Sequence, residues 1–111
     1  MAEVEQYRKL VCDFLLAQCP PDEDHGEVES QLILDSERDR YLLIDMGWQD
    51  LKRIYACVIH LEIREGKIWI QRNMTETDIA TALVESGIPK EDIILGLQPA
   101  YKRPYTGYGA A

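Results

Sequence analysis

The sequence predicts an α+β fold in which a four-stranded antiparallel meander carries two helices on one face. Three observations lead to this prediction. An apolar stripe at helical spacing opens the chain, four segments with a period of two follow with short connections, and a second helical segment comes after them. Because 111 residues are too few for two stable cores, residues 1–111 are expected to form one domain.

The first helix is predicted over residues 3–18, because its apolar side chains recur every three or four positions. These side chains are Tyr7, Leu10, Val11, Phe14 and Leu15. The helix should end at Cys19, because two prolines follow and the acidic run after them favours an exposed loop.

Four strands are predicted over residues 28–35, 41–48, 54–64 and 67–73, which are rich in β-branched and aromatic side chains. The pair Glu65-Gly66 is a two-residue turn signal between the last two. Strict alternation predicts a dry face made of Tyr55, Cys57, Ile59, Leu61 and Ile63, joined by Ile68 and Ile70. The other face is mixed and holds Ala56, Val58, His60, Glu62 and Arg64, opposite Lys67, Trp69 and Gln71.

A second helix is predicted over residues 75–87, with Thr75 or Thr77 as its cap and Gly87 as its left-handed end. Its expected buried stripe consists of Ile79, Ala80, Leu83 and Val84. Residues 94–96 are expected to add a short strand, and the C-terminal tail after them is expected to be ordered, with its tyrosines packed and Lys102 and Arg103 paired with acidic neighbours or a partner.

The charge distribution disfavours an arm that binds nucleic acid. The chain has a net charge of −8, and residues 93–111 carry Lys102 and Arg103 without an acid, so the residues before them carry −10. Such a body repels phosphates unless its charges are strongly segregated. Since no long apolar run and no signal core occur, we expect a cytoplasmic protein without membrane spans.

The cysteine, histidine, acidic and lysine residues that could act in catalysis or bind a metal do not form a site that we recognise. No catalytic, metal-binding or cofactor-binding residue is therefore predicted. Cys12, Cys19 and Cys57 have no paired spacing and are expected to be free thiols. The acidic run before His25 is read as a solvated loop, and His60 as a hydrogen-bonded structural residue. A nuclease centre from Asp22, Glu65 and Lys67 is disfavoured, because the aspartate falls in a loop and the glutamate in a turn.

The candidate interaction residues are aromatic and basic: Trp69, Tyr101, Lys102, Arg103 and Tyr105. Trp69 lies on the predicted mixed face, where an indole is either covered by the tail or exposed for a partner. The sequence leaves these two alternatives open.

Several motifs along residues 4–109 together resemble the XisI family, small cyanobacterial proteins described as controlling factors for excision of the fdxN element. The motifs are Asp35, Glu37, Arg38, Asp39 and Tyr41; Gly47-Trp48; Arg53, Tyr55, Cys57, Ile59 and His60; residues 66–71; Thr75-Glu76; residues 87–93; and residues 101–106. The resemblance implies an α+β fold and a link to programmed DNA excision during heterocyst differentiation, where a separate recombinase cuts. It implies no catalytic residues.

Three functions are therefore weighed. The resemblance and the missing catalytic constellation favour a non-enzymatic accessory protein that acts through protein contacts, with an XisH-like partner implied by the family. The second is direct DNA binding through Arg38, Arg40, Lys52, Arg53, Lys102 and Arg103, and the third is a metal-dependent nuclease. The aromatic mixed face and the unprotected sheet edge also favour a homodimer.

Overall fold

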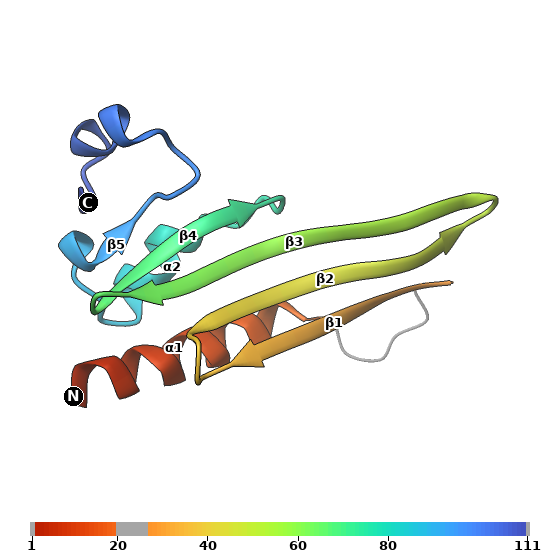
Figure 1. The fold of residues 1–111 in the computed structure, drawn as a ribbon, viewed down its shortest axis with the longest axis horizontal. Coiled ribbons are helices and arrows are strands. Elements are labelled where there is room, and N and C mark those ends of the chain that lie inside the picture. The colour runs from red at the N-terminus through yellow and green to blue at the C-terminus, as the bar shows by residue number, and fades with distance from the viewer. Residues whose placement is uncertain (1, 20–26, 111) are drawn as a thin grey trace.

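The computed structural model describes residues 2–19 and 27–110 of the chain (Figure 1). In chain order its elements are α1 (Ala2–Gln18), β1 (Val28–Asp35), β2 (Arg40–Gln49), β3 (Lys52–Arg64), β4 (Lys67–Asn73), α2 (Ile79–Glu85), the 3-10 helix η1 (Lys90–Asp92), β5 (Ile93–Ile94) and the 3-10 helix η2 (Ala100–Tyr105). The α+β class and the four predicted strands are confirmed, with β2 and β3 each one or two residues longer at the turn between them.

The sheet has five strands in the order β1-β2-β3-β4-β5, not four. The first four form the predicted antiparallel meander, and β5 adds a parallel edge beside β4, with Ile93 opposite Ile68. The short strand expected at 94–96 therefore begins one residue earlier, and the sheet is mixed. Ile93 and Ile94 are fully buried, which explains why this two-residue strand is held against β4.

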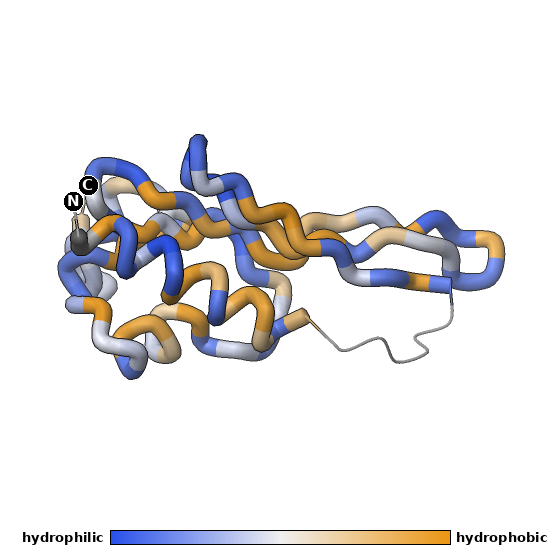
Figure 2. Tube along the Cα trace, turned by 90° about the horizontal axis from the view of Figure 1, so that it is seen from below, coloured by the Kyte–Doolittle hydropathy of each residue, from blue (hydrophilic) through white to orange (hydrophobic). Residues whose placement is uncertain are grey.

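Both helices cover the same side of the sheet (Figure 2), so the apolar core lies between them and β2–β4. On α1 the predicted stripe is confirmed: Tyr7, Val11 and Leu15 are buried, and Leu10 and Phe14 pack against the same core. On α2 the stripe of Ile79, Ala80 and Leu83 is buried, with Val84 beside it. No helix in these described segments is long and apolar enough to cross a membrane.

Strands β1–β3 run well beyond the helices (Figures 1 and 2). We call the projecting part of β2 and β3 the arm and define it as residues 44–57, including the turn between the two strands. The molecule measures 43 × 31 × 24 Å, and its radius of gyration is 14.9 Å. A compact chain of this length would have a radius of gyration of about 13 Å. The projecting arm explains why the radius of gyration exceeds that of a compact chain, and no described helix covers the arm.

The predicted dry face is wrong at its beginning, because β3 contains a β-bulge. Leu43 pairs with Ile59 but Ile44 pairs with Cys57, so Val58 is an extra residue on β3. Neighbouring residues of β2 point to opposite faces, so Cys57 and Ile59 do too. Accordingly Val58, predicted outside, packs against the core, while Tyr55, predicted inside, is 64% exposed.

The second helix begins later than predicted, because the two threonines do not cap it. Asp78 is the N-cap, and its carboxylate accepts a hydrogen bond from the backbone N–H of Thr81 at 3.1 Å. Thr75 instead donates its hydroxyl to Asn73 Oδ1 at 2.6 Å, which makes an ordered loop after β4. Gly87 adopts the predicted left-handed conformation, with φ +108°.

Candidate interaction surface

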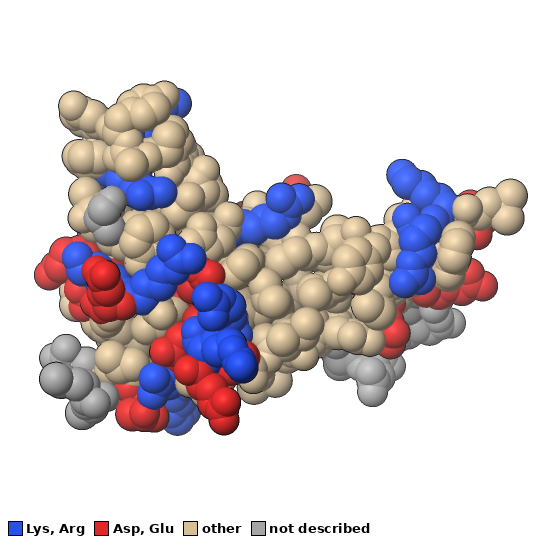
Figure 3. All heavy atoms as spheres, in the orientation of Figure 1, with Lys and Arg blue, Asp and Glu red and all other residues tan. Residues whose placement is uncertain are grey.

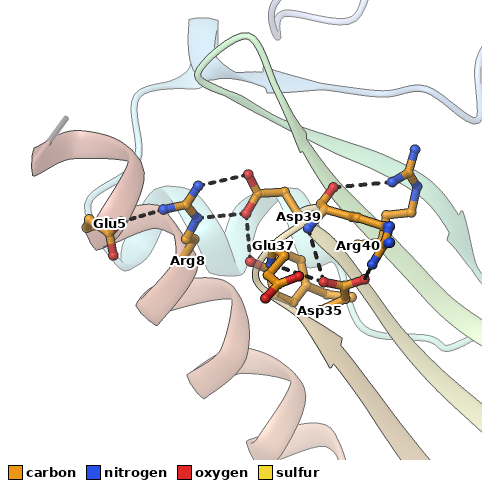
Figure 4. A network of polar contacts seen from close by, with 8 residues as sticks. Glu5, Arg8, Asp35, Glu37, Asp39 and Arg40 are labelled. Atoms are coloured by element: carbon orange, nitrogen blue, oxygen red, sulfur yellow. Dashed lines mark hydrogen bonds and ion pairs between the residues drawn. The ribbon is translucent and has the colours of Figure 1, made fainter.

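The turn from Asp35 to Tyr41 holds α1 onto the sheet (Figure 4). Asp35 Oδ1 accepts the backbone N–H groups of Glu37 and Arg38, both at 3.0 Å, and these contacts hold the pKa of Asp35 below its usual value. Asp39, at φ +56°, then reaches Arg8 of α1. The acidic and basic residues of this motif therefore shape the fold.

The contact between Arg8 and Asp39 is a two-point ion pair. Arg8 Nε donates to Asp39 Oδ1 at 2.7 Å and Arg8 Nη2 to Oδ2 at 3.1 Å, while the Tyr41 hydroxyl donates to Oδ1 at 2.9 Å. The hydrogen bonds from Arg8 are the main reason that the pKa of Asp39 is lowered. Burial is the main reason that the pKa of Tyr41 is raised. Sequence reasoning missed this pair, because nothing in the spacing links Arg8 to a turn 31 residues away.

A second polar cluster lies on the sheet face opposite the helices, which we call the outer face. Its centre is Glu62, a carboxylate that is only 5% exposed. Arg64 Nη2 lies 2.8 Å and Arg40 Nε 3.6 Å from its oxygens, and Gln71 Nε2 donates to it at 3.4 Å. Two guanidinium groups and an amide thus compensate the buried charge.

His60 lies beside this cluster but is not hydrogen-bonded through Nε2, contrary to the prediction. Its Nε2 approaches Glu62 Oε1 to 3.5 Å, and the two groups form an ion pair only when the imidazole is protonated. No group of three or more His, Cys, Asp or Glu within residues 2–19 and 27–110 is arranged to hold a metal ion. The loop that contains Asp22 and His25 lies outside the described residues. Glu65 lies in the β3–β4 turn, as predicted.

Trp69 is the link between the sheet and the C-terminal tail. Two guanidinium groups contact its ring, with the Arg64 carbon 5.4 Å and the Arg103 carbon 5.1 Å from the ring centre. Gly96 packs so close to the ring that a Cβ there would lie 3.1 Å from Trp69 Cε3. Of the two alternatives for Trp69, the tail covers it, and the indole is partly buried.

The tail is ordered, as predicted, but only part of it packs. Gly109 forms a parallel bridge with Ile94, and its backbone N–H contacts Ile93 O at 2.8 Å, while Tyr108 packs against the core. In contrast, Tyr101 is 72% and Tyr105 88% exposed, so the prediction that these tyrosines pack is wrong. Both lie on η2, which Pro99 starts and which turns their rings outward.

The two basic residues of the tail differ. Arg103 stacks on Trp69, and its Nε donates to Gln98 O at 3.1 Å, so it fixes the fold of the tail. Lys102 is exposed and lies 6.0 Å from the centre of the Tyr101 ring. The structure therefore leaves Tyr101, Lys102 and Tyr105 of the five candidates free for contact on the surface.

The basic residues considered for DNA binding do not form one edge (Figure 3). Arg38 lies in the β1–β2 turn and Arg40 begins β2, whereas Lys52 and Arg53 follow the β2–β3 turn at the other end of β2. About ten residues of strand, or roughly 30 Å, separate these turns.

The three cysteines are free and partly buried, as predicted. Burial raises the pKa of the Cys12 and Cys57 thiols, so neither is an activated nucleophile.

Comparison with known proteins places these features in a family. A family model described as XisI protein matches residues 1–110. The crystal structure of a XisI-like protein from Anabaena variabilis superposes with a TM-score of 0.92 at 50% identity, covering 97% of this chain and 99% of that one. The fdxN element excision controlling factor XisI from the same organism gives a TM-score of 0.78 at 33% identity, covering 98% and 99%. Among curated proteins there is no match.

Proposed function

Because this chain belongs to the XisI family, we propose that it is a non-enzymatic regulatory protein that controls excision of a DNA element through protein contacts. The observation that carries the proposal is the match along the whole chain, at 33% identity, to a protein named as an excision controlling factor. We place its action in the cytoplasm, beside a separate recombinase that performs the cutting and joining.

The proposed partner is an XisH-like protein, as the family resemblance implies. Tyr101, Lys102 and Tyr105 support a role for the tail, because two exposed tyrosines beside a lysine are typical of residues that gain contact area in an interface. Trp69 and Arg103 would act beneath them by holding η2 in place. We also propose a homodimer through β1, the edge strand at one end of the sheet.

Co-purification with an XisH-like protein tests the proposal. We expect binding at micromolar concentration in low salt, and a loss of at least tenfold in affinity when Tyr101 and Tyr105 are both replaced by Ala. No binding of the unchanged protein under these conditions would contradict the proposal. Sedimentation analysis of the protein alone tests the dimer, which a monomer at 100 μM would exclude.

A direct DNA-binding regulator is the second candidate, and Lys52 and Arg53, exposed at the end of the arm beside Trp48, favour it. Binding would then weaken steeply between 50 and 200 mM salt, because cations are released from the phosphates. A gel shift that shows no complex at low salt removes this candidate. An assay with magnesium and manganese tests for nuclease activity, and cleavage by purified protein would overturn the non-enzymatic assignment.

A further inference from the structure

The outer face of the arm carries an apolar stripe that no described element covers. Strand β2 is apolar on both sides: Tyr41 and Leu43 point into the core, so Leu42, Ile44, Met46 and Trp48 point the other way. Cross-strand pairing adds Ile33, opposite Leu42, and Tyr55, opposite Met46. From Leu42 to Trp48 the stripe is about 20 Å long.

Three of the six side chains in this stripe are exposed. Leu42, Ile44 and Met46 are partly buried by their neighbours, whereas Ile33 is 42%, Trp48 48% and Tyr55 64% exposed. None of the six side chains belongs to the core cluster. Continuous apolar patches of this kind on a folded protein mark interaction sites, and exposed aromatic side chains provide much of the binding energy in such sites.

Arginines surround the stripe. Arg40 and Arg64 lie at its end over the body, Arg53 lies opposite Trp48 at the end of the arm, and Arg72 of β4 lies opposite His60. Figure 3 looks onto this side of the molecule and shows an uncharged expanse between the two groups of basic side chains. Arg53 also stacks on Trp48, with its guanidinium carbon 5.6 Å from the ring centre.

The carboxylates on this face offset the arginines only in part. Glu62 is buried beneath Arg40 and Arg64, and Asp35 is engaged by the backbone of its own turn. Glu29, on β1 opposite Met46, is a third acid on this face, and Glu27 and Asp50 lie beside Trp48 at the end of the arm. The rim nevertheless carries four exposed arginines on a chain whose net charge is −8.

We propose that this outer face of the arm is a second docking surface for the protein partner, in addition to the tail, and that the partner presents apolar side chains inside a rim of carboxylates. The proposal rests on the proposed function and adds this second contact and the chemistry of its recognition. Opposite charges at the rim would set the orientation of the partner, while the stripe supplies the buried area.

Two other occupants fit the surface less well. A second copy docked face to face would bring its own arginine rim against this one, and such like-charge contacts are unfavourable. A nucleic acid would meet a centre that is mainly aliphatic, with Ile33, Leu42, Ile44 and Met46, whereas bases stack on aromatic rings. The net charge of −8 also repels phosphates.

A labelled peptide tests the surface without knowledge of the partner. The probe is fluorescein-Glu-Glu-Val-Leu-Val-Leu-Val-Glu-Glu-amide, with the same peptide carrying Lys in place of every Glu as its counterpart. Fluorescence anisotropy at 50 mM salt should show the acidic peptide binding at least tenfold more tightly than the basic one. Arg53→Glu and Trp48→Ala should each weaken binding at least tenfold, whereas Lys9→Glu, an exposed cation on α1, should leave it unchanged.

Equal binding of the two peptides, or an equal loss with Lys9→Glu, would overturn the proposal. So would tighter binding of a fluorescein-labelled 20-base-pair DNA, which would assign the face to nucleic acid, or a dimer that Trp48→Ala dissociates. Circular dichroism of each variant confirms that it folds.

The same variants in the co-purification separate the two proposals. If the XisH-like protein binds the unchanged chain and the Arg53→Glu variant equally, the docking surface is wrong and the proposed function stands. If it does not bind the unchanged chain while the acidic peptide binds, the surface stands and the partner assignment fails.

Discussion

Replacement of Asp39 by Asn measures how strongly the turn after β1 holds α1. Asn tolerates the left-handed backbone that Asp39 adopts at φ +56°, so the change removes the charge with little backbone strain. The side chains of Arg8 and Asp39 are 28% and 17% exposed, which lies between surface pairs and fully buried ones. Surface pairs contribute up to about 1 kcal/mol, and breaking a buried pair costs about 3–5 kcal/mol. We expect Asp39→Asn to cost about 1–2 kcal/mol.

Urea unfolding followed by circular dichroism measures this loss. With a slope of about 1.5 kcal/mol per molar urea, the midpoint should fall by roughly 1 M. A double-mutant cycle with Arg8→Met isolates the coupling between the two side chains, which should account for most of the effect. The matched control is Asp13→Asn, which removes the exposed pair with Lys9 and should change stability by less than about 0.5 kcal/mol.

The pH dependence of the stability difference between the wild-type protein and Asp39→Asn provides an independent test. Because folding lowers the pKa of Asp39, its contribution is complete above the unfolded pKa of about 3.9 and is lost as the pH falls through the lower folded value. The difference between the wild-type protein and Asp39→Asn should therefore be constant from pH 5 to 7 and shrink below pH 4. A coupling below about 0.3 kcal/mol, or a difference that persists unchanged at pH 3, would refute the reasoning.

Three further outcomes follow from close contacts and burial. Gly47→Ala should cost more than about 3 kcal/mol in urea unfolding, because its Cβ would lie 1.9 Å from the carbonyl oxygen of Glu27. Gly66→Ala, with open space around it, should cost only about 1–2 kcal/mol. Equal losses of stability for the two variants would contradict this expectation. Trp69→Ala should release the tail, so limited trypsin digestion should cleave after Lys102 at least tenfold faster. An unchanged rate would show that other contacts hold the tail. Cys57 should react with a disulfide reagent more slowly than free cysteine at pH 8, because burial raises the pKa of its thiol. The reaction rate should rise when urea unfolds the protein. A rate equal to that of free cysteine in the folded protein would contradict the burial of Cys57.

The sequence predicts those parts of this fold that depend on neighbours along the chain. The stripe on α1, the four strands and the Glu65-Gly66 turn follow from period and turn chemistry, and all are confirmed. The bulge at Val58 escapes such reasoning, because β-branched residues continue through it and only the pairing of Ile44 with Cys57 reveals it. One extra residue then moves Tyr55 to the opposite face.

Contacts between distant segments account for the other differences. Strand β5 exists because Ile93 and Ile94 find space beside β4, and two apolar residues carry too little periodicity to predict it. The outward tyrosines of η2 depend on how Arg103 stacks on Trp69. The arm cannot be predicted from the sequence for a similar reason, because the residues of β2 do not indicate whether a helix covers the end of the strand.

Neighbouring strands and helices cover only one part of β3, so we expect the two parts of this strand to open to solvent in different ways. Residues 59–62 lie between β2 and β4, so their amide protons should exchange with solvent only through global unfolding. Residues 52–56 pair with β2 alone and have no helix behind them, so they should exchange through local separation of the arm. The bulge at Val58 marks the boundary. A partner that binds the arm would then also slow its opening, and the ordering entropy would reduce the net affinity.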